Sequence, residues 1–104
     1  MKICGIICEY NPFHNGHAYL IERAKKESDC DAVVCVMSGN FTQRGEIALL
    51  GKYTRARHAL LAGADAVLEL PAVFALSPAE IFARGAVKIL SSIPAFEALA
   101  FGCE

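Results

Sequence analysis

The chain has 104 residues, of which 55% are hydrophobic and 20% charged, and its formal net charge is −1. This length suits one domain with a modest core, and the balanced charge excludes a strongly basic face for gripping a long stretch of nucleic acid. The N-terminal apolar run is too short to span a membrane and no cleavage-site pattern follows it, so we expect a cytoplasmic protein without membrane attachment.

The first half of the chain predicts a strand, a helix and a second strand. KICGIIC at 2–8 and AVVCVM at 32–37 are apolar throughout, which is typical of strands buried on both faces. Between them, residues 15–28 show helical periodicity. The apolar stripe of this helix consists of Ala18, Leu20, Ile21 and Ala24.

The second half repeats the alternation. A helix is predicted over 49–62, with Gly63 suited to its C-terminal end, and DAVLEL at 65–70 reads as a third strand. FEALAFG at 96–102 reads as a fourth strand.

The start of the helix before the last strand has its own signal. Ser77 is a predicted N-cap, Pro78 takes the favoured first helical position, and Glu80 completes a capping-box spacing. We expect this helix to run to about Leu90.

Alternating strands and helices predict an α/β fold: a Rossmann-like, doubly wound, mainly parallel sheet with helices on both faces. In such sheets ligands bind beyond the carboxyl ends of the strands. The polar loops 9–17 and 38–46 each follow a strand, and Gly102 ends the last strand. All three segments are therefore expected at one edge, around one site.

The first loop contains the motif H-x-G-H, formed by His14, Gly16 and His17. Neither a G-x-G-x-x-G turn nor a P-loop is present after the first strand. A helix N-terminus with unpaired N–H groups favours phosphate, Gly16 permits close approach, and two imidazoles can donate hydrogen bonds to charge developing at phosphorus. The motif predicts a phosphate-binding site in which both histidines are catalytic.

Other interpretations of the motif are weaker. A zinc-type site would need a third ligand, for which Glu9 is the only obvious candidate, so no metal centre is predicted. Nucleophilic chemistry at Cys8 conflicts with its place in a strand. The five cysteines are odd in number and contain no C-x-x-C pair, so we expect small buried hydrophobes in a reducing cytosol.

The second loop, SGNFTQRGE at 38–46, is either a solvated loop or part of the same site. As part of the site, Arg44 would attract a carboxylate or a phosphate, and Asn40 or Gln43 would orient the substrate.

Several other charged residues have a structural and a functional interpretation. Glu69, at the end of a strand, either faces the ligand or caps a backbone group. Arg84 and Lys88 read as solvated. The basic residues of the predicted helix over 49–62 indicate a solvated face rather than a contact with nucleic-acid phosphates. They are Lys52, Arg55, Arg57 and His58.

PFHNGH resembles the H-x-G-H signature of the nucleotidyltransferase superfamily. A longer set of segments is similar to the N-terminal part of the bacterial tRNA(Met) cytidine acetate ligase family, across essentially the whole chain. These segments are GIICEYNPFHNGH, VMSGNFTQRGE, LELP, IFARGAVKIL and EALAFGCE. Members of that family are considerably longer, so the resemblance implies an N-terminal, nucleotidyltransferase-like ATP-binding domain at 1–104.

The resemblance implies that ATP, with Mg²⁺, and acetate form acetyl-adenylate, and that the acetyl group passes to N4 of the wobble cytidine of elongator tRNA(Met). A fragment without the rest of the site would be a poor catalyst and is open to self-association. Open alternatives are an inactive nucleotide-binding fragment and another small-molecule adenylyl- or cytidylyltransferase. The implied ATP contacts are Ile7, Cys8, Glu9, Tyr10, Asn11, Pro12, Phe13, His14, Asn15, Gly16, His17, Ala18, Tyr19, Leu20 and Gly102.

Overall fold

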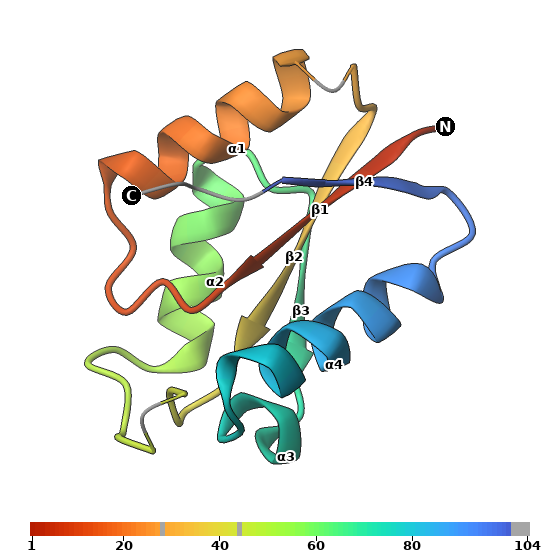
Figure 1. Ribbon diagram of the computed structural model, residues 1–104. Coiled ribbons are helices and arrows are strands. Elements are labelled where there is room, and N and C mark those ends of the chain that lie inside the picture. Colours follow the sequence, from red (N-terminus) through yellow and green to blue (C-terminus); the bar gives the residue numbers. More distant parts are fainter. Residues whose placement is uncertain (28, 44, 101–104) are drawn as a thin grey trace.

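The protein forms one four-stranded parallel sheet, seen in a computed structural model that describes residues 1–27, 29–43 and 45–100. The strand order is β3-β2-β1-β4, with β1 in the interior of the sheet (Figure 1). Every strand pair is parallel, as the alternating pattern predicts. The strands are β1 (Ile3–Cys8), β2 (Ala32–Ser38), β3 (Ala66–Leu70) and β4 (Phe96–Ala100).

Helices cover both faces of the sheet, which confirms the doubly wound α/β architecture. Helices α1 and α2 lie on one face, and α3 and α4 lie on the other (Figure 1). The four helices are α1 (Asn15–Glu27), α2 (Lys52–Leu61), α3 (Ala72–Ala75) and α4 (Ala79–Ser91).

The core consists of two apolar layers, one on each side of the sheet. Strand residues alternate between the layers: Cys35 packs with Ile21 of α1 and Ala59 of α2, whereas Val36 packs on the α4 side with Leu90. Because both faces are buried, β1 and β2 need continuous apolar sequence rather than alternation. Of the predicted α1 stripe, Ile21 and Ala24 are fully buried.

Close packing on the α4 side depends on a helical glycine. A Cβ added at Gly85 of α4 would lie 2.5 Å from Cγ of Phe74 in α3. Glycine is a poor residue for a helix interior, so its presence here reflects the close approach of the two helices.

The region between β3 and α4 differs from the sequence expectation. The short helix α3 was not predicted, and Ser77 is not an N-cap, because Pro78 takes that position. The Ser77 hydroxyl donates to the Val73 carbonyl at 2.6 Å, and Glu80 pairs with Arg84 at 2.8 Å. The reason is that α3 ends just before α4. The Val73 carbonyl of α3 therefore accepts the hydrogen bond of the Ser77 hydroxyl, which is then not available to cap α4.

The other boundaries agree closely with the prediction. Helix α2 begins at Lys52 rather than near residue 49, and Gly63 follows it with a φ of +118°, which glycine adopts readily. Cys4 and Cys35 are fully buried, as expected for small hydrophobes, whereas Ser28 and Cys103 lie outside the described residues. None of the helices within residues 1–27, 29–43 and 45–100 is long and apolar enough to cross a membrane.

Candidate functional site

Two loops meet at the carboxyl edge of the sheet, as the sequence predicts. In the structure the first loop covers residues 9–14, because α1 begins at Asn15, and the second loop covers residues 39–51, between β2 and α2. The Glu9 carboxylate accepts hydrogen bonds from the Ser38 hydroxyl at 3.0 Å and from the Gln43 N–H at 2.9 Å. The Asn11 side-chain oxygen accepts the Leu49 N–H at 2.7 Å. The two loops are thus joined by hydrogen bonds on both sides of the site.

Arg55 of α2 holds the same loops together from within the protein. Its side chain is fully buried, and its guanidinium donates to the carbonyls of Glu9 at 2.6 Å, Ser38 at 3.2 Å and Leu50 at 3.0 Å. A further hydrogen bond reaches the Gly39 carbonyl. Burial lowers the pKa of Arg55, and the negative charge of Glu9 opposes that shift, so the group stays cationic.

The burial of Arg55 contradicts the expectation of a solvated helix face. A guanidinium can be buried only when its N–H groups find acceptors, and loop carbonyls supply them here. Arg57, two residues away, is exposed as expected. Sequence reasoning missed the role of Arg55 because its partners are main-chain oxygens. Every residue type carries such an oxygen, so the sequence does not reveal these partners.

Glu69 forms an ion pair rather than a backbone cap. Its carboxylate lies 2.8 Å from the Lys52 ammonium, and this hydrogen bond raises the lysine pKa. Lys52 is therefore bound to the end of β3. Like Arg55, it belongs to the predicted solvated face but has a defined partner. Arg84, by contrast, is largely exposed on α4 as predicted, and Lys88 is exposed as well.

The two histidines of the H-x-G-H motif stack on each other. Their ring centroids are 3.7 Å apart and their planes differ by 22°. Nδ1 of His17 accepts the His14 backbone N–H at 3.1 Å, and Nδ1 of His14 accepts the Gly16 N–H at 3.1 Å. Because each Nδ1 is an acceptor, each neutral ring carries its proton on Nε2. The motif thus presents two Nε2–H donors.

Aromatic packing sets the position and the charge of His17. Its ring lies 4.8 Å from the Tyr10 ring and 5.5 Å from the Phe13 ring. Burial lowers the pKa of His17, and the nearby His14 lowers it further. Tyr10 is itself buried, with a φ of +53° that non-glycine residues seldom adopt. The neutral, donating form of His17 is therefore favoured near neutral pH.

The start of α1 differs from the expected anion site. The Gly16 N–H bonds to His14 Nδ1, and the His17 N–H bonds to the His14 carbonyl at 3.0 Å. These two amides are thus not free for phosphate, because the chain itself satisfies them. Gly16 makes room for an imidazole: an added Cβ would lie 2.9 Å from His14 Cε1. The donors that the turn offers are the imidazole Nε2 atoms.

A cavity of about 600 Å³ opens between the loops. Its volume lies in the range of ~300–1,000 Å³ that is usual for small-molecule sites. It is lined by Glu9, Tyr10, Asn11, Pro12, His14, His17, Thr42, Gln43 and Glu46. Thr42 and Glu46 were not predicted, although their position in the second loop was a signal for them.

The remaining predicted site residues lie elsewhere or are not described. Tyr19 is exposed on α1, where its hydroxyl accepts a hydrogen bond from Arg23 at 2.8 Å. Asn40 lines a second, smaller cavity, whereas Arg44 and Gly102 lie outside the described residues. The predicted ATP contacts that do not line the first cavity are Ile7, Cys8, Phe13, Asn15, Gly16, Ala18 and Leu20.

The chain is similar to curated proteins of known name. The chain is 57% identical to the tRNA(Met) cytidine acetate ligase of Acetivibrio thermocellus and 55% identical to that of Clostridium tetani, over all 104 residues. It spans about a quarter of the length of these curated relatives, 25% and 26% respectively.

The fold matches crystal structures of Thermotoga maritima TmcAL. The form bound with alpha-thio ATP superimposes with a TM-score of 0.95 at 49% identity, covering all of this chain and 25% of that one. The apo form gives a TM-score of 0.94. The model of the HIGH Nucleotidyl Transferase family matches residues 1–104. The chain therefore belongs to the HIGH Nucleotidyl Transferase family.

Proposed function

We propose that the chain binds ATP and supplies the phosphate-binding part of a tRNA(Met) cytidine acetate ligase. The observation that carries this proposal is the pair of Nε2–H donors of His14 and His17 beside a cavity of about 600 Å³. The relatives' name and the alpha-thio ATP bound to Thermotoga maritima TmcAL support it. This activity belongs to the cytoplasm, where tRNA is modified.

The proposed reaction has two steps. An acetate oxygen attacks the α-phosphorus of ATP, the bond to the β-phosphate oxygen breaks, and pyrophosphate leaves with the electron pair. The N4 amine of the wobble cytidine of elongator tRNA(Met) then attacks the acetyl carbonyl, AMP leaves, and the nitrogen loses a proton. The first step needs positioning and charge stabilisation more than covalent help, which is what two fixed imidazole donors provide.

The second loop is the proposed place for acetate. Gln43 lines the cavity, and its backbone N–H is held by Glu9 at 2.9 Å, so the residue is fixed beside the histidines. Arg44 follows Gln43 in sequence, and we propose that its charge attracts the carboxylate.

The site also fits a magnesium ion that arrives with ATP. Mg²⁺ commonly binds one or two carboxylates together with substrate phosphates, and Glu9 and Glu46 both line the cavity. The described residues hold no cluster of three or more His, Cys, Asp or Glu side chains arranged for a metal ion. The ion would neutralise phosphate charge beside these two carboxylates.

An equilibrium binding measurement with ATP, paired with acetate-dependent ATP–pyrophosphate exchange, tests the proposal. We expect His14→Asn and His17→Asn each to weaken ATP binding about tenfold or more, as loss of a donor to charged phosphate should. A chain that does not bind ATP, or variants that bind it as well as the wild type, would contradict the proposal.

A second candidate is nucleotide binding without catalysis. The observation in its favour is that the chain spans about a quarter of its curated relatives. ATP binding with no pyrophosphate exchange would support this candidate, whereas exchange that depends on acetate would support the ligase. We expect exchange by residues 1–104 alone to be weak.

A further inference from the structure

A second cavity lies at the same edge of the sheet, and the proposed function does not use it. Its volume is about 220 Å³, and it is lined by Gly39, Asn40, Phe41, Glu69, Leu70, Ala72 and Ala75. This volume is below the ~300–1,000 Å³ of drug-sized sites, so its occupant is a single ring system rather than a whole nucleotide.

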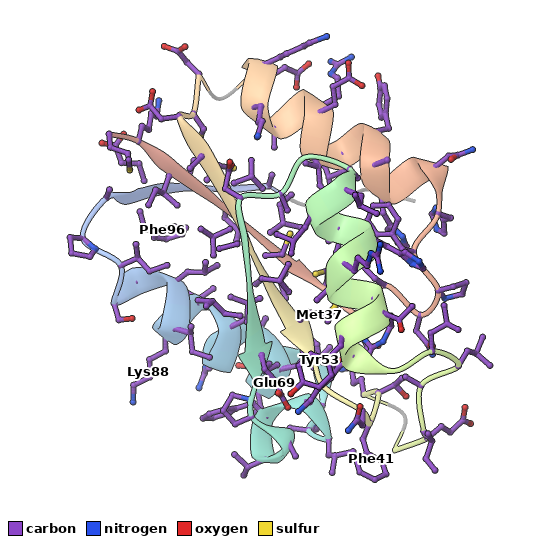
Figure 2. The ribbon with its side chains drawn as sticks, turned by 180° about the vertical axis from the view of Figure 1, so that it is seen from behind. Met37, Phe41, Tyr53, Glu69, Lys88 and Phe96 are labelled. Carbon is purple, nitrogen blue, oxygen red and sulfur yellow. The ribbon has the colours of Figure 1, made fainter. Side chains whose placement is uncertain are left out.

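The lining of this cavity suits a flat, partly polar ring. Leu70 and Ala75 lie behind this cavity with their side chains fully buried, whereas Phe41 is 45% exposed at its wall. Aromatic side chains at the surface are the groups on which unpaired bases stack. Figure 2 shows Phe41, Tyr53 and Glu69 at the same end of the sheet.

A carboxylate and an amide supply the polar part. Glu69 is held by Lys52 through one oxygen, Oε1, at 2.8 Å, and its Oε2 faces Gly39, where an added Cβ would collide with it. The Asn40 side-chain oxygen accepts the Lys52 N–H at 3.4 Å, which leaves the amide N–H groups as donors. A carboxylate beside an amide fits a ring that has an exocyclic amine next to an acceptor atom.

The neighbourhood adds a second aromatic surface. Tyr53 is 82% exposed, and the Lys52 ammonium lies 5.5 Å from its ring centroid. Lys52 therefore contacts both Glu69 and Tyr53, and its positive charge lies beside the exposed ring. An exposed aromatic ring beside a cation is a combination that single-stranded nucleic-acid sites share.

The two cavities are separate but consecutive along the second loop. Residues 39–41 line the smaller one, residues 42 and 43 line the larger one, and they share no lining residue. A group bound at Glu69 is thus outside the cavity that contains His14 and His17. Neighbouring nucleotides of one strand fit this arrangement, with one base reacting and the next one held.

We propose that the cavity between Glu69 and Phe41 binds an unpaired nucleobase with an exocyclic amine, next to the base that reacts. This inference rests on the proposed function, because it assumes a nucleic-acid acceptor. It assigns recognition of the nucleic-acid strand to residues outside the phosphate-binding site. The ligand class is an amine-bearing base, cytosine, adenine or guanine, rather than uracil.

Nucleoside titrations followed by NMR test the inference without ATP. The probes are cytidine and uridine, which lack phosphate and differ at the exocyclic amine. We expect cytidine to shift the backbone amides of Gly39, Asn40 and Leu70, with a Kd of about 1–10 mM and about tenfold tighter binding than uridine. Equal binding of both nucleosides, or shifts confined to the amides near His14 and His17, would overturn the proposal.

Two variants assign the preference to the carboxylate. Glu69→Gln should remove the preference for cytidine, and Phe41→Ala should weaken the binding of both nucleosides equally. Glu97→Gln, an exposed carboxylate on β4, is the matched control and should change neither. If Glu69→Gln does not fold, Lys52→Met replaces it: this change leaves Glu69 without its lysine partner, so the preference for cytidine should rise. A preference that survives Glu69→Gln, or one that Lys52→Met lowers, rejects the inference, whatever ATP binding shows.

Discussion

His14 and His17 stack with ring centroids 3.7 Å apart, and each ring accepts a backbone N–H through Nδ1. Burial and the nearby His14 both lower the pKa of His17, so its neutral form is favoured. Protonation of His17 Nδ1 would also cost the hydrogen bond that this atom accepts from the His14 N–H.

The first prediction concerns the pKa of His17. Replacing His14 by Gln removes the neighbouring charge, so the pKa of His17 should rise toward its ordinary value while burial still holds it below that value. NMR titration of the His17 ring protons measures the change. His58→Gln, whose ring lies beyond Phe13, is the control and should leave the titration unchanged. An unaltered His17 pKa in His14→Gln would contradict the coupling.

The second prediction concerns stability against pH. Because folding lowers the pKa of His17, the unfolded chain binds more protons below about pH 6.5 than the folded chain does. The contribution of His17 is thus complete above that pH and is lost as the pH falls through the lowered folded value. Urea unfolding at pH 7.5 and pH 5.5 should show a smaller loss for His17→Asn than for the wild type. Equal losses of stability in the two proteins would contradict this role of His17.

The third prediction concerns Arg55. Arg55→Ala removes the donor to four carbonyls, of which those of Ser38 and Gly39 are buried, and each buried unpaired group costs ~1–3 kcal/mol. We expect the free energy of unfolding to fall by at least about 3 kcal/mol.

Arg57→Ala on the same helix is the matched control for Arg55. Its side chain is exposed, so its effect should stay within about 0.5 kcal/mol. Urea unfolding measures both variants. Similar small effects at the two positions would show that the buried hydrogen bonds contribute little.

The fourth prediction concerns the contact between α3 and α4. Gly85→Ala improves helix propensity by about 1 kcal/mol, but the new methyl group meets Phe74, and overpacking costs about 1–3 kcal/mol. We expect a net loss of stability. In a Phe74→Ala background the loss should be smaller, because the ring is gone, although the Cβ of residue 74 still lies 2.8 Å from the added methyl group. If Gly85→Ala stabilised the wild-type protein, α3 would be shown to move aside without loss of stability.

The sequence predicted the sheet well because burial on both faces leaves a plain signal, as in the apolar runs of β1 and β2. It also placed the H-x-G-H turn and the second loop at one edge, because parallel strands present their carboxyl ends together. The fold and the general position of the site followed from these two signals.

Contacts made through the main chain were the ones that sequence reasoning missed. Arg55 looks like any basic residue of a solvated helix, and only the loops that fold over it supply acceptors. Ser77 satisfies the pattern for an N-cap, yet α3 offers its hydroxyl a nearer carbonyl. In both cases the side chain bonds to a carbonyl group that the local sequence does not reveal, instead of adopting the arrangement that the local pattern predicts.

The central place of β1 makes the two ends of the chain depend on each other during folding. Ile3 pairs with Ala32 in β2 and with Phe96 in β4, so the first strand made is completed only when the last one arrives. Contacts between residues so far apart slow folding, because a long loop must close before the pairing rewards it. The turn that holds His14 and His17 directly follows β1, so its final form depends on the pairing of both neighbouring strands.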